Sequence, residues 1–224
     1  MSLFEEHKAE RRARIGKAAR KLLAERGYEG LTMRDLANAA RVAVPTLYNL
    51  FGSKDAILVA ELEAHARDYA ARFPRGNGSF FSRAMAAFDA GMQLIEDSPE
   101  LYRASMQMFM TSPESRDMQH RLEDGYIAIM AGNLAAAKAA GQLADWADPP
   151  LVARHLFAQY MCTFIAWGIG ELDLPTFRAA ALSGLCHILV GVARGEFARD
   201  VEAKLRSLPK LEISREVPRA KAHR

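Results

Sequence analysis

Apolar residues recur at helical spacing along most of the chain. Near the N-terminus they fall at i, i+3, i+4, i+7 and i+8 among charged residues, at Ile15, Ala18, Ala19, Leu22 and Leu23. This period predicts one amphipathic helix over about residues 5–26. Gly27 is a natural end for it, because glycine readily adopts the left-handed backbone that closes helices.

Three further helix starts follow within about thirty residues. Thr32 can cap a short helix that ends near Ala40, with Asp35 at the reciprocal capping-box position. After a break at residues 41–43, the pattern predicts a helix over 44–51, where Pro45 suits the first turn. Gly52 ends it, and Ser53 caps a long helix from Lys54 to about Phe73, with Asp55 in its first turn. The expected core of this region is Ile15, Leu22, Leu36, Ala37, Val42, Leu47 and Phe51.

The remaining chain also reads as helical. Pro, Gly, Asn and Ser mark a loop over residues 74–79. Three apolar stripes follow, comprising Phe81, Met85, Phe88, Met92 and Ile95; Leu101, Ser105, Met106 and Phe109; and Met118, Leu122, Tyr126, Ile129 and Met130. Residues 151–170 and 175–195 are apolar nearly all round, and no segment alternates as a strand would. The fold class expected is therefore all-α, with about nine or ten helices.

Charge is placed unevenly. The net charge is +3, yet residues 1–54 hold eleven Lys and Arg against six Asp and Glu. Such an excess is typical of a nucleic-acid face and also of ordinary solvated helices, so charge alone leaves both readings open. The charged N-terminus lacks the apolar stretch of a signal peptide, and the apolar stretches fall short of the roughly 18 residues of a membrane span. We expect a cytoplasmic protein without a membrane partner.

One ordered set of residues resembles a known family. Gly27-Tyr28, then Thr32 to Ala37 (TMRDLA), Thr46-Leu47-Tyr48 and Phe51 to Lys54 (FGSK) are similar to the N-terminal signature of TetR-family regulators. The resemblance covers about residues 15–58. It implies an N-terminal three-helix helix-turn-helix DNA-binding module over residues 1–53, and a helical bundle for ligand binding and dimerisation over 54–208. Residues 209–224 are expected to form a basic, disordered tail.

The resemblance also implies roles for individual residues. The helix over Val44–Asn49 would enter the major groove. Thr32 and Lys54 would contact phosphates, Arg34 a base edge or a phosphate, and Tyr48 the DNA backbone. The expected base-edge residues are Pro45, Thr46 and Asn49, since an amide can pair with adenine and apolar groups can touch a thymine methyl. Asn49 as a merely exposed helix residue is the alternative.

Two positions depart from the family pattern. The family usually has Gly at position 41 and a capping Ser at position 43, whereas this chain has Arg41 and Ala43. A lost serine cap is worth about 1 kcal/mol, so the turn is expected to be less stable or differently bent. Pro45 would partly compensate by restricting the unfolded chain.

The bundle contains two candidate surfaces. A Met- and aromatic-rich set would line a pocket for a small apolar ligand, although a helical stripe of this kind also suits a plain core. These residues are Phe88, Met92, Tyr102, Met106, Met110, His120, Tyr126 and Met130. The last two long helices would form the dimer interface, the alternative being a purely intramolecular core. Its expected residues are Leu156, Phe157, Tyr160, Met161, Phe164, Leu185, Ile188, Leu189 and Val192.

No motif for catalysis, cofactor binding or metal binding stands out. The six histidines form no HExxH pattern, and His155, Cys162, Cys186 and His187 are expected to serve packing. We therefore expect no enzyme, but a homodimeric repressor that binds double-stranded operator DNA and is released by a small apolar ligand. The alternative is a helical small-molecule carrier or enzyme without specific DNA binding.

Overall fold

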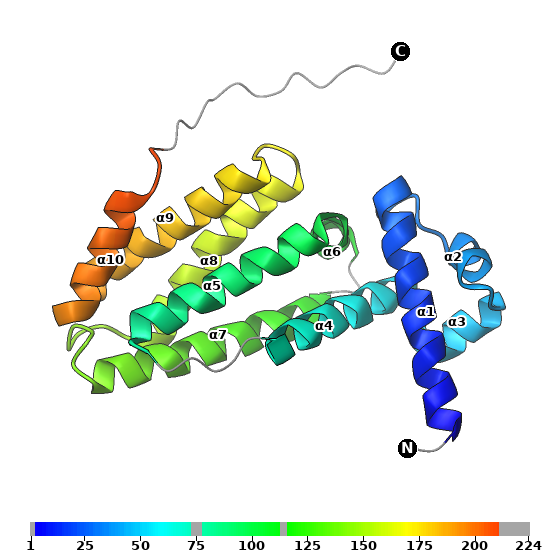
Figure 1. Ribbon diagram of the computed structural model, residues 1–224, viewed down its shortest axis with the longest axis horizontal. Helices are drawn as coiled ribbons and strands as arrows, with labels where there is room; N and C mark the ends of the chain where they lie inside the picture. Colours follow the sequence, from blue (N-terminus) through cyan, green and yellow to red (C-terminus); the bar gives the residue numbers. More distant parts are fainter. Residues whose placement is uncertain (1–2, 73–77, 113–115, 211–224) are drawn as a thin grey trace, which may run out of the picture. The chain divides into compact units, whose positions relative to one another are not determined.

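Ten α-helices make up the regular structure of residues 3–72, 78–112 and 116–210, the part of the chain that this computed structural model describes (Figure 1). The all-α prediction is confirmed. The predicted tail from residue 211 onward and most of the predicted loop at 74–79 lie outside the described residues.

The helices form two compact units. One comprises residues 1–75 and 90–117, and the other comprises residues 76–89 and 118–224. Helix α5 (Phe80–Asp97) contributes to both, because the boundary falls between Asp89 and Ala90.

The first unit contains α1 (Leu3–Arg26), α2 (Met33–Ala40), α3 (Val44–Phe51), α4 (Lys54–Arg72) and α6 (Pro99–Thr111). Helix α1 packs against α2, α4 and α6. The predicted caps are present. Gly27 and Gly52 have positive φ, and the Ser53 hydroxyl accepts a hydrogen bond from the Ala56 amide at 3.1 Å. Of the predicted core residues, Val42 and Phe51 are half-buried and the rest are buried.

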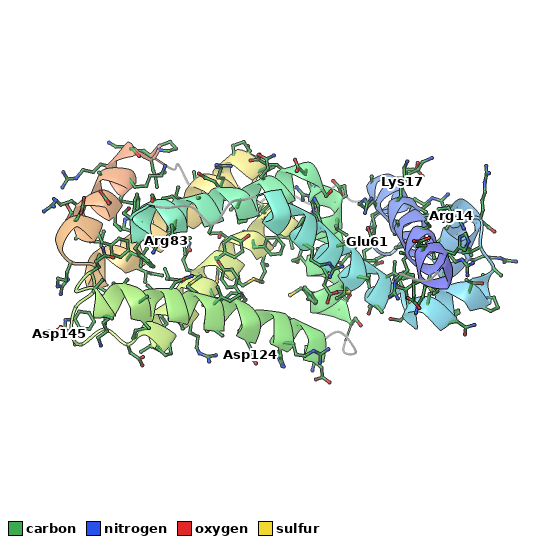
Figure 2. All side chains as sticks on the ribbon, turned by 60° about the horizontal axis from the view of Figure 1, so that its bottom comes forward. Arg14, Lys17, Glu61, Arg83, Asp124 and Asp145 are labelled. Atoms are coloured by element: carbon green, nitrogen blue, oxygen red, sulfur yellow. The ribbon has the colours of Figure 1, made fainter. Side chains whose placement is uncertain are left out.

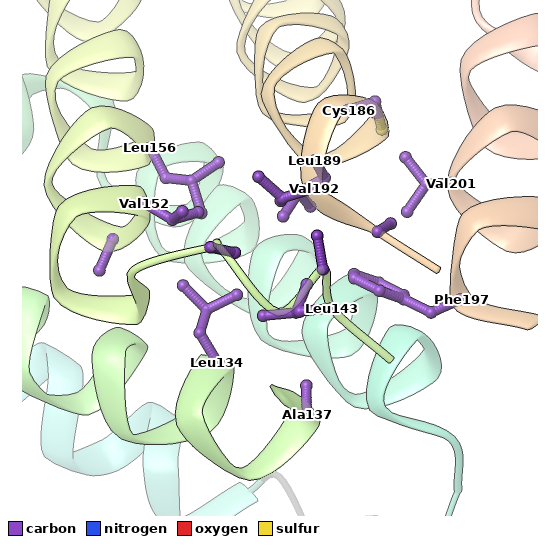
Figure 3. Packing of buried hydrophobic residues seen from close by; sticks show 14 of the residues in the cluster. Leu134, Ala137, Leu143, Val152, Leu156, Cys186, Leu189, Val192, Phe197 and Val201 are labelled. Carbon is purple, nitrogen blue, oxygen red and sulfur yellow. The ribbon is translucent and has the colours of Figure 1, made fainter. Parts of the chain in front are cut away.

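The second unit contains α7 (Arg116–Ala139), α8 (Pro149–Gly168), α9 (Leu174–Val192) and α10 (Gly195–Ser207). Its core joins these helices through residues such as Leu134, Leu156, Leu189 and Phe197 (Figure 3). By length and composition alone α9 could cross a membrane, but core helices pass the same test, and α9 packs on α8 and α10.

The stripe predicted for residues 118–130 is corrected at two positions in α7, since Tyr126 and Ile129 are exposed. Met130 is half-buried and packs against the core, while the side chains of Met118 and Leu122 lie outside the described residues. The buried residues of α7 are Ile127, Leu134 and Ala137, so the core-facing side includes Met130 and continues into the turns that follow it.

Candidate nucleic-acid interface

Helix α3 presents one contiguous polar and aromatic face. Leu47 is fully buried and fixes the helix on the core, whereas Pro45, Tyr48 and Asn49 are exposed at i, i+3 and i+4. Tyr48 is 52% exposed, although it is a large ring. Val44 and Thr46 are half-buried beside this face. The major groove of DNA admits an α-helix, so this exposed face could contact base edges there.

Thr32 and Arg34 lie at the start of α2. The Thr32 hydroxyl accepts a 3.1 Å hydrogen bond from the Asp35 amide, which is the predicted cap, and donates a 2.7 Å bond to the Asp35 carboxylate. Arg26 lies 3.4 Å from the same carboxylate. Arg34 is exposed. Thr32 therefore stabilises the helix start with both functions of its hydroxyl, and the Arg34 side chain extends into solvent.

The turn between α2 and α3 keeps the backbone that glycine would favour. Arg41 has φ 53° and ψ 51°, and is the one non-glycine residue with positive φ in the described ranges. Its amide donates to the Asn38 carbonyl, and the Val42 amide donates to the Ala37 carbonyl at 3.0 Å. This pair of bonds is a Schellman motif. Ala43, the N-cap of α3, supplies no side-chain bond. Arg41 thus adopts the left-handed backbone that glycine favours at this position, and Ala43 leaves the start of α3 without a side-chain cap.

Lys54 begins α4 and makes two contacts with Tyr28. Its ammonium donates a 3.1 Å hydrogen bond to the Tyr28 carbonyl oxygen and lies 3.9 Å from the centre of the Tyr28 ring. An ammonium group carries three N–H donors, so these contacts leave capacity for a phosphate. They also hold the connection between α1 and α2 against the start of α4.

Two arginines that the sequence did not single out also contact this region. The Arg12 guanidinium lies 4.5 Å from the centre of the Phe51 ring at the end of α3. Arg14 donates from Nε to the Ala40 carbonyl oxygen at 3.0 Å. Arg14 and Lys17 are labelled on α1 in Figure 2. For Arg12 the available signal was its spacing, since it precedes Ile15 by three positions on the same helix.

Buried polar contacts hold α4 in the first unit. Glu61 is only 7% exposed and forms an ion pair with Arg20 of α1. A Cβ atom at Gly16 would overlap the Glu61 carboxylate, so α1 has glycine where this carboxylate approaches. The apolar stripe predicted for α1 gave no indication of this contact. The signal in the sequence was a glycine, Gly16, within a long predicted helix.

The eight predicted pocket residues are divided between the units. Met92 and Met106 are buried in the first unit with the half-buried Tyr102, and Met110 there is 66% exposed. Burial raises the pKa of the Tyr102 hydroxyl well above its usual range, with the Asp97 carboxylate adding to the effect. The second unit holds the half-buried Phe88 and Met130 and the exposed His120 and Tyr126. Tyr126 packs on Phe157, with ring centres 5.5 Å apart.

The predicted dimer residues fall into two groups. Leu156, Phe164, Leu189 and Val192 are buried in the second unit. The others, namely Phe157, Tyr160, Met161, Leu185 and Ile188, are half-buried. A different face of α8 is exposed, with Leu151, Ala158, Cys162 and Ile169 at i, i+7, i+11 and i+18. When a helix is apolar on all sides, its sequence does not predict which side packs in the core of the same chain.

The His and Cys residues of α8 and α9 do not gather into a metal site. Within the described residues, no group of three His, Cys, Asp or Glu side chains could hold a metal ion. Cys162 is exposed and Cys186 is buried, and burial raises the pKa of the Cys186 thiol.

The N-terminal region matches a known family. Residues 15–60 match the family described as bacterial regulatory proteins, tetR family. A relative named HTH-type transcriptional regulator EthR, from Mycolicibacterium smegmatis, is 26% identical over 140 residues, which are 61% of this chain and 64% of the relative. The match thus spans slightly less than two thirds of that protein.

Solved structures share the fold over most of the chain. SmeT, the repressor of the Stenotrophomonas maltophilia multidrug efflux pump SmeDEF, aligns with a TM-score of 0.66 at 20% identity, over 83% of this chain and 92% of SmeT. A SmeT–triclosan complex aligns with the same TM-score at 19% identity, over 84% of this chain and 93% of that chain. At this identity the likeness establishes the fold. Together with the match over residues 15–60, it supports a resemblance of this chain to bacterial regulatory proteins of the tetR family.

Proposed function

We propose that this chain is a sequence-specific DNA-binding transcriptional regulator, a homodimeric repressor that a small apolar ligand releases from its operator. The observation that carries the proposal is the exposed face of α3. Pro45, Tyr48 and Asn49 stand together on a short helix that Leu47 anchors in the core. Residues 1–53 would bind DNA in the cytoplasm, and 54–208 would bind ligand and partner subunit.

Asn49 and Tyr48 allow the DNA half of the proposal to be tested. A randomised DNA pool is first selected with the wild-type protein, and affinities for the selected site and for random DNA are then compared. Asn49→Ala removes an amide that could pair with a base, so it should cost about 1 to 3 kcal/mol of discrimination. Tyr48→Phe removes one hydroxyl and should weaken binding to both DNAs equally, as loss of a backbone contact does.

Asn38→Ala is the matched control, because Asn38 is an exposed asparagine on α2 outside the α3 face. It should bind as the wild type does. Weak binding by the wild type without preference between the selected and random DNA would contradict the proposal, and would favour a helical carrier or enzyme.

The dimer half of the proposal rests on the exposed face of α8, which is apolar except for His155. Two such faces from two copies would bury Leu151, Cys162 and Ile169, and a two-fold dimer would present two α3 helices to successive major grooves. Ala158→Asp introduces a charge into this face, whereas Ala203→Asp makes the same change at an exposed position of α10. Sedimentation should detect a dimer for the wild type and Ala203→Asp, and a monomer for Ala158→Asp.

The ligand half draws support from the SmeT–triclosan complex, since SmeT shares this fold. A ligand shifts a two-state equilibrium only by its different affinity for the two states. A small apolar compound that raises the melting temperature of the protein should therefore lower its affinity for the selected DNA. Compounds that stabilise the protein and leave DNA affinity unchanged would contradict ligand release.

A further inference from the structure

Helix α1 extends well beyond the core that it serves. Among its described side chains the first buried one is Ile15, whereas those from Glu5 to Arg14 are exposed, except for the half-buried Lys8. These ten residues are about three turns, or about 15 Å of helix. A helical segment that buries no apolar face of its own gains little from the protein core, so its surface chemistry is informative.

Most charges on this extension are sorted by face. Lys8, Arg11 and Arg12 precede Ile15 by seven, four and three positions, so they continue the face that packs on the helix-turn-helix further along α1. Glu6 and Glu10 lie on the opposite face, since they are nine and five positions before Ile15, whereas Glu5 lies beside Lys8 and Arg12. The basic side of the extension therefore points in the same direction as the buried side of α1.

Two arginine contacts hold this side of α1 against α2 and α3, which with their turn (residues 32–53) are called the reading region below. Arg12 stacks on Phe51, the last residue of α3, with 4.5 Å between the guanidinium carbon and the ring centre. Arg14 is held by its 3.0 Å bond to the Ala40 carbonyl. A guanidinium that stacks on a ring keeps its N–H edge available for hydrogen bonds. Arg12 is thus held beside the end of α3 with its donors free to meet an anion.

We propose that the N-terminal extension of α1 is a second DNA-binding element, in which Lys8, Arg11 and Arg12 contact phosphates flanking the groove that α3 reads. This inference rests on the proposed function. Arginine matches the geometry of phosphate oxygens, and such contacts add affinity without reading sequence. The partner is the DNA backbone, because Arg12 contacts the end of α3 and the other two cations lie on the same side of α1 by helical spacing.

Salt dependence gives a direct test. Each phosphate contact contributes about 0.9 to the slope of log affinity against log salt concentration. Because the proposed homodimer carries two copies of α1, Arg11→Gln/Arg12→Gln removes four contacts and should lower this slope by about 3.6, while the ratio of affinities for selected and random DNA stays at the wild-type value. The affinity deficit of the variant should shrink by about two orders of magnitude between about 50 and 200 mM salt. Glutamine preserves helix propensity.

Lys17→Gln/Lys21→Gln is the matched control. It removes two positive charges from the same helix, at exposed positions on the side away from Ile15. The control should keep the wild-type slope, and both double variants should keep the wild-type circular dichroism. Equal slopes for Arg11→Gln/Arg12→Gln and the wild type would overturn the inference. An equal drop in slope for both double variants would also overturn it, since it would indicate a general charge effect.

Failure of the proposed function has a different signature. If the wild type does not distinguish selected from random DNA, the regulator proposal fails. The slopes on random DNA would still test whether α1 contacts phosphates.

Discussion

The Ser112 hydroxyl donates a 2.6 Å hydrogen bond to one carboxylate oxygen of Asp55, and the Tyr28 hydroxyl donates a 2.7 Å bond to the other. Asp55 lies in the first turn of α4, where a negative charge also complements the helix dipole. The residue following α6 and the connection between α1 and α2 are therefore both tied to the start of α4. Since α4 begins directly after the reading region, Asp55 stabilises the place where that region joins the longer helices.

Ser112→Ala should lower the free energy of unfolding by about 1 to 2 kcal/mol, because hydrogen bonds to charged groups are stronger than neutral ones. Urea denaturation measures the change. Thr111→Ala is the control, since the Thr111 hydroxyl donates only to the Gln107 carbonyl of its own helix and is exposed. Equal destabilisation by the two substitutions would show that the bond to Asp55 has no special weight.

Arg41→Gly should stabilise the protein. Arg41 holds a left-handed backbone at φ 53°, which costs a residue with a Cβ about 1 kcal/mol and costs glycine almost nothing. The urea midpoint should rise without a change in the denaturant slope. Arg41→Ala separates the backbone effect from the side chain, since alanine retains the Cβ and should give no such gain. A gain of similar size for alanine would assign the effect to the arginine side chain.

Local rules predicted the reading region well. Thr32, Gly27, Gly52 and Ser53 act as caps through neighbours no more than four residues away, and such interactions can be read from the order of residues. The contact of Lys54 with Tyr28 joins residues 26 positions apart, and its geometry follows from how the helices pack. No local rule contains that information.

The bundle was harder to predict for a different reason. Helices α8 and α9 are apolar on nearly every side, so their sequence indicates burial without indicating direction. Leu156 and Val192 consequently belong to the core of the second unit, while Leu151 and Ile169 remain exposed. The boundary between Asp89 and Ala90 falls inside one continuous helix, where neither a proline nor a change of composition marks it.

The effect of Gly16→Ala on the free energy of unfolding should have opposite signs with and without the Glu61 carboxylate. Alanine favours a helix interior over glycine by about 1 kcal/mol. At position 16, however, its Cβ would displace the Glu61 carboxylate, which is buried and paired with Arg20. Breaking a buried pair costs more than the propensity gain, although the half-exposed Arg20 reduces that cost. We expect Gly16→Ala to destabilise the wild type and to stabilise the Glu61→Ala variant.

Thermal or urea unfolding of the four proteins in this double-mutant cycle measures the coupling. Ala24→Gly is the control within α1, and it should cost about 1 kcal/mol in both backgrounds because Ala24 is exposed. The same sign for Gly16→Ala in both backgrounds would show that Gly16 does not serve the approach of Glu61.

Tyr102 should make the protein less stable at alkaline pH. Burial, with a smaller effect of the Asp97 carboxylate, raises the pKa of its hydroxyl above the usual value of about 10. Above that pH the unfolded chain releases the proton while the folded chain retains it, so stability is complete below about pH 10 and falls as pH rises. The loss attributable to this one group approaches about 1.4 kcal/mol per pH unit.

Unfolding free energies at pH 8 and about pH 11 should therefore differ less for Tyr102→Phe than for the wild type. Asp97→Asn should retain most of the wild-type loss, because burial is the larger cause. If Tyr102→Phe loses stability as steeply as the wild type does, the hydroxyl of Tyr102 is not the group responsible.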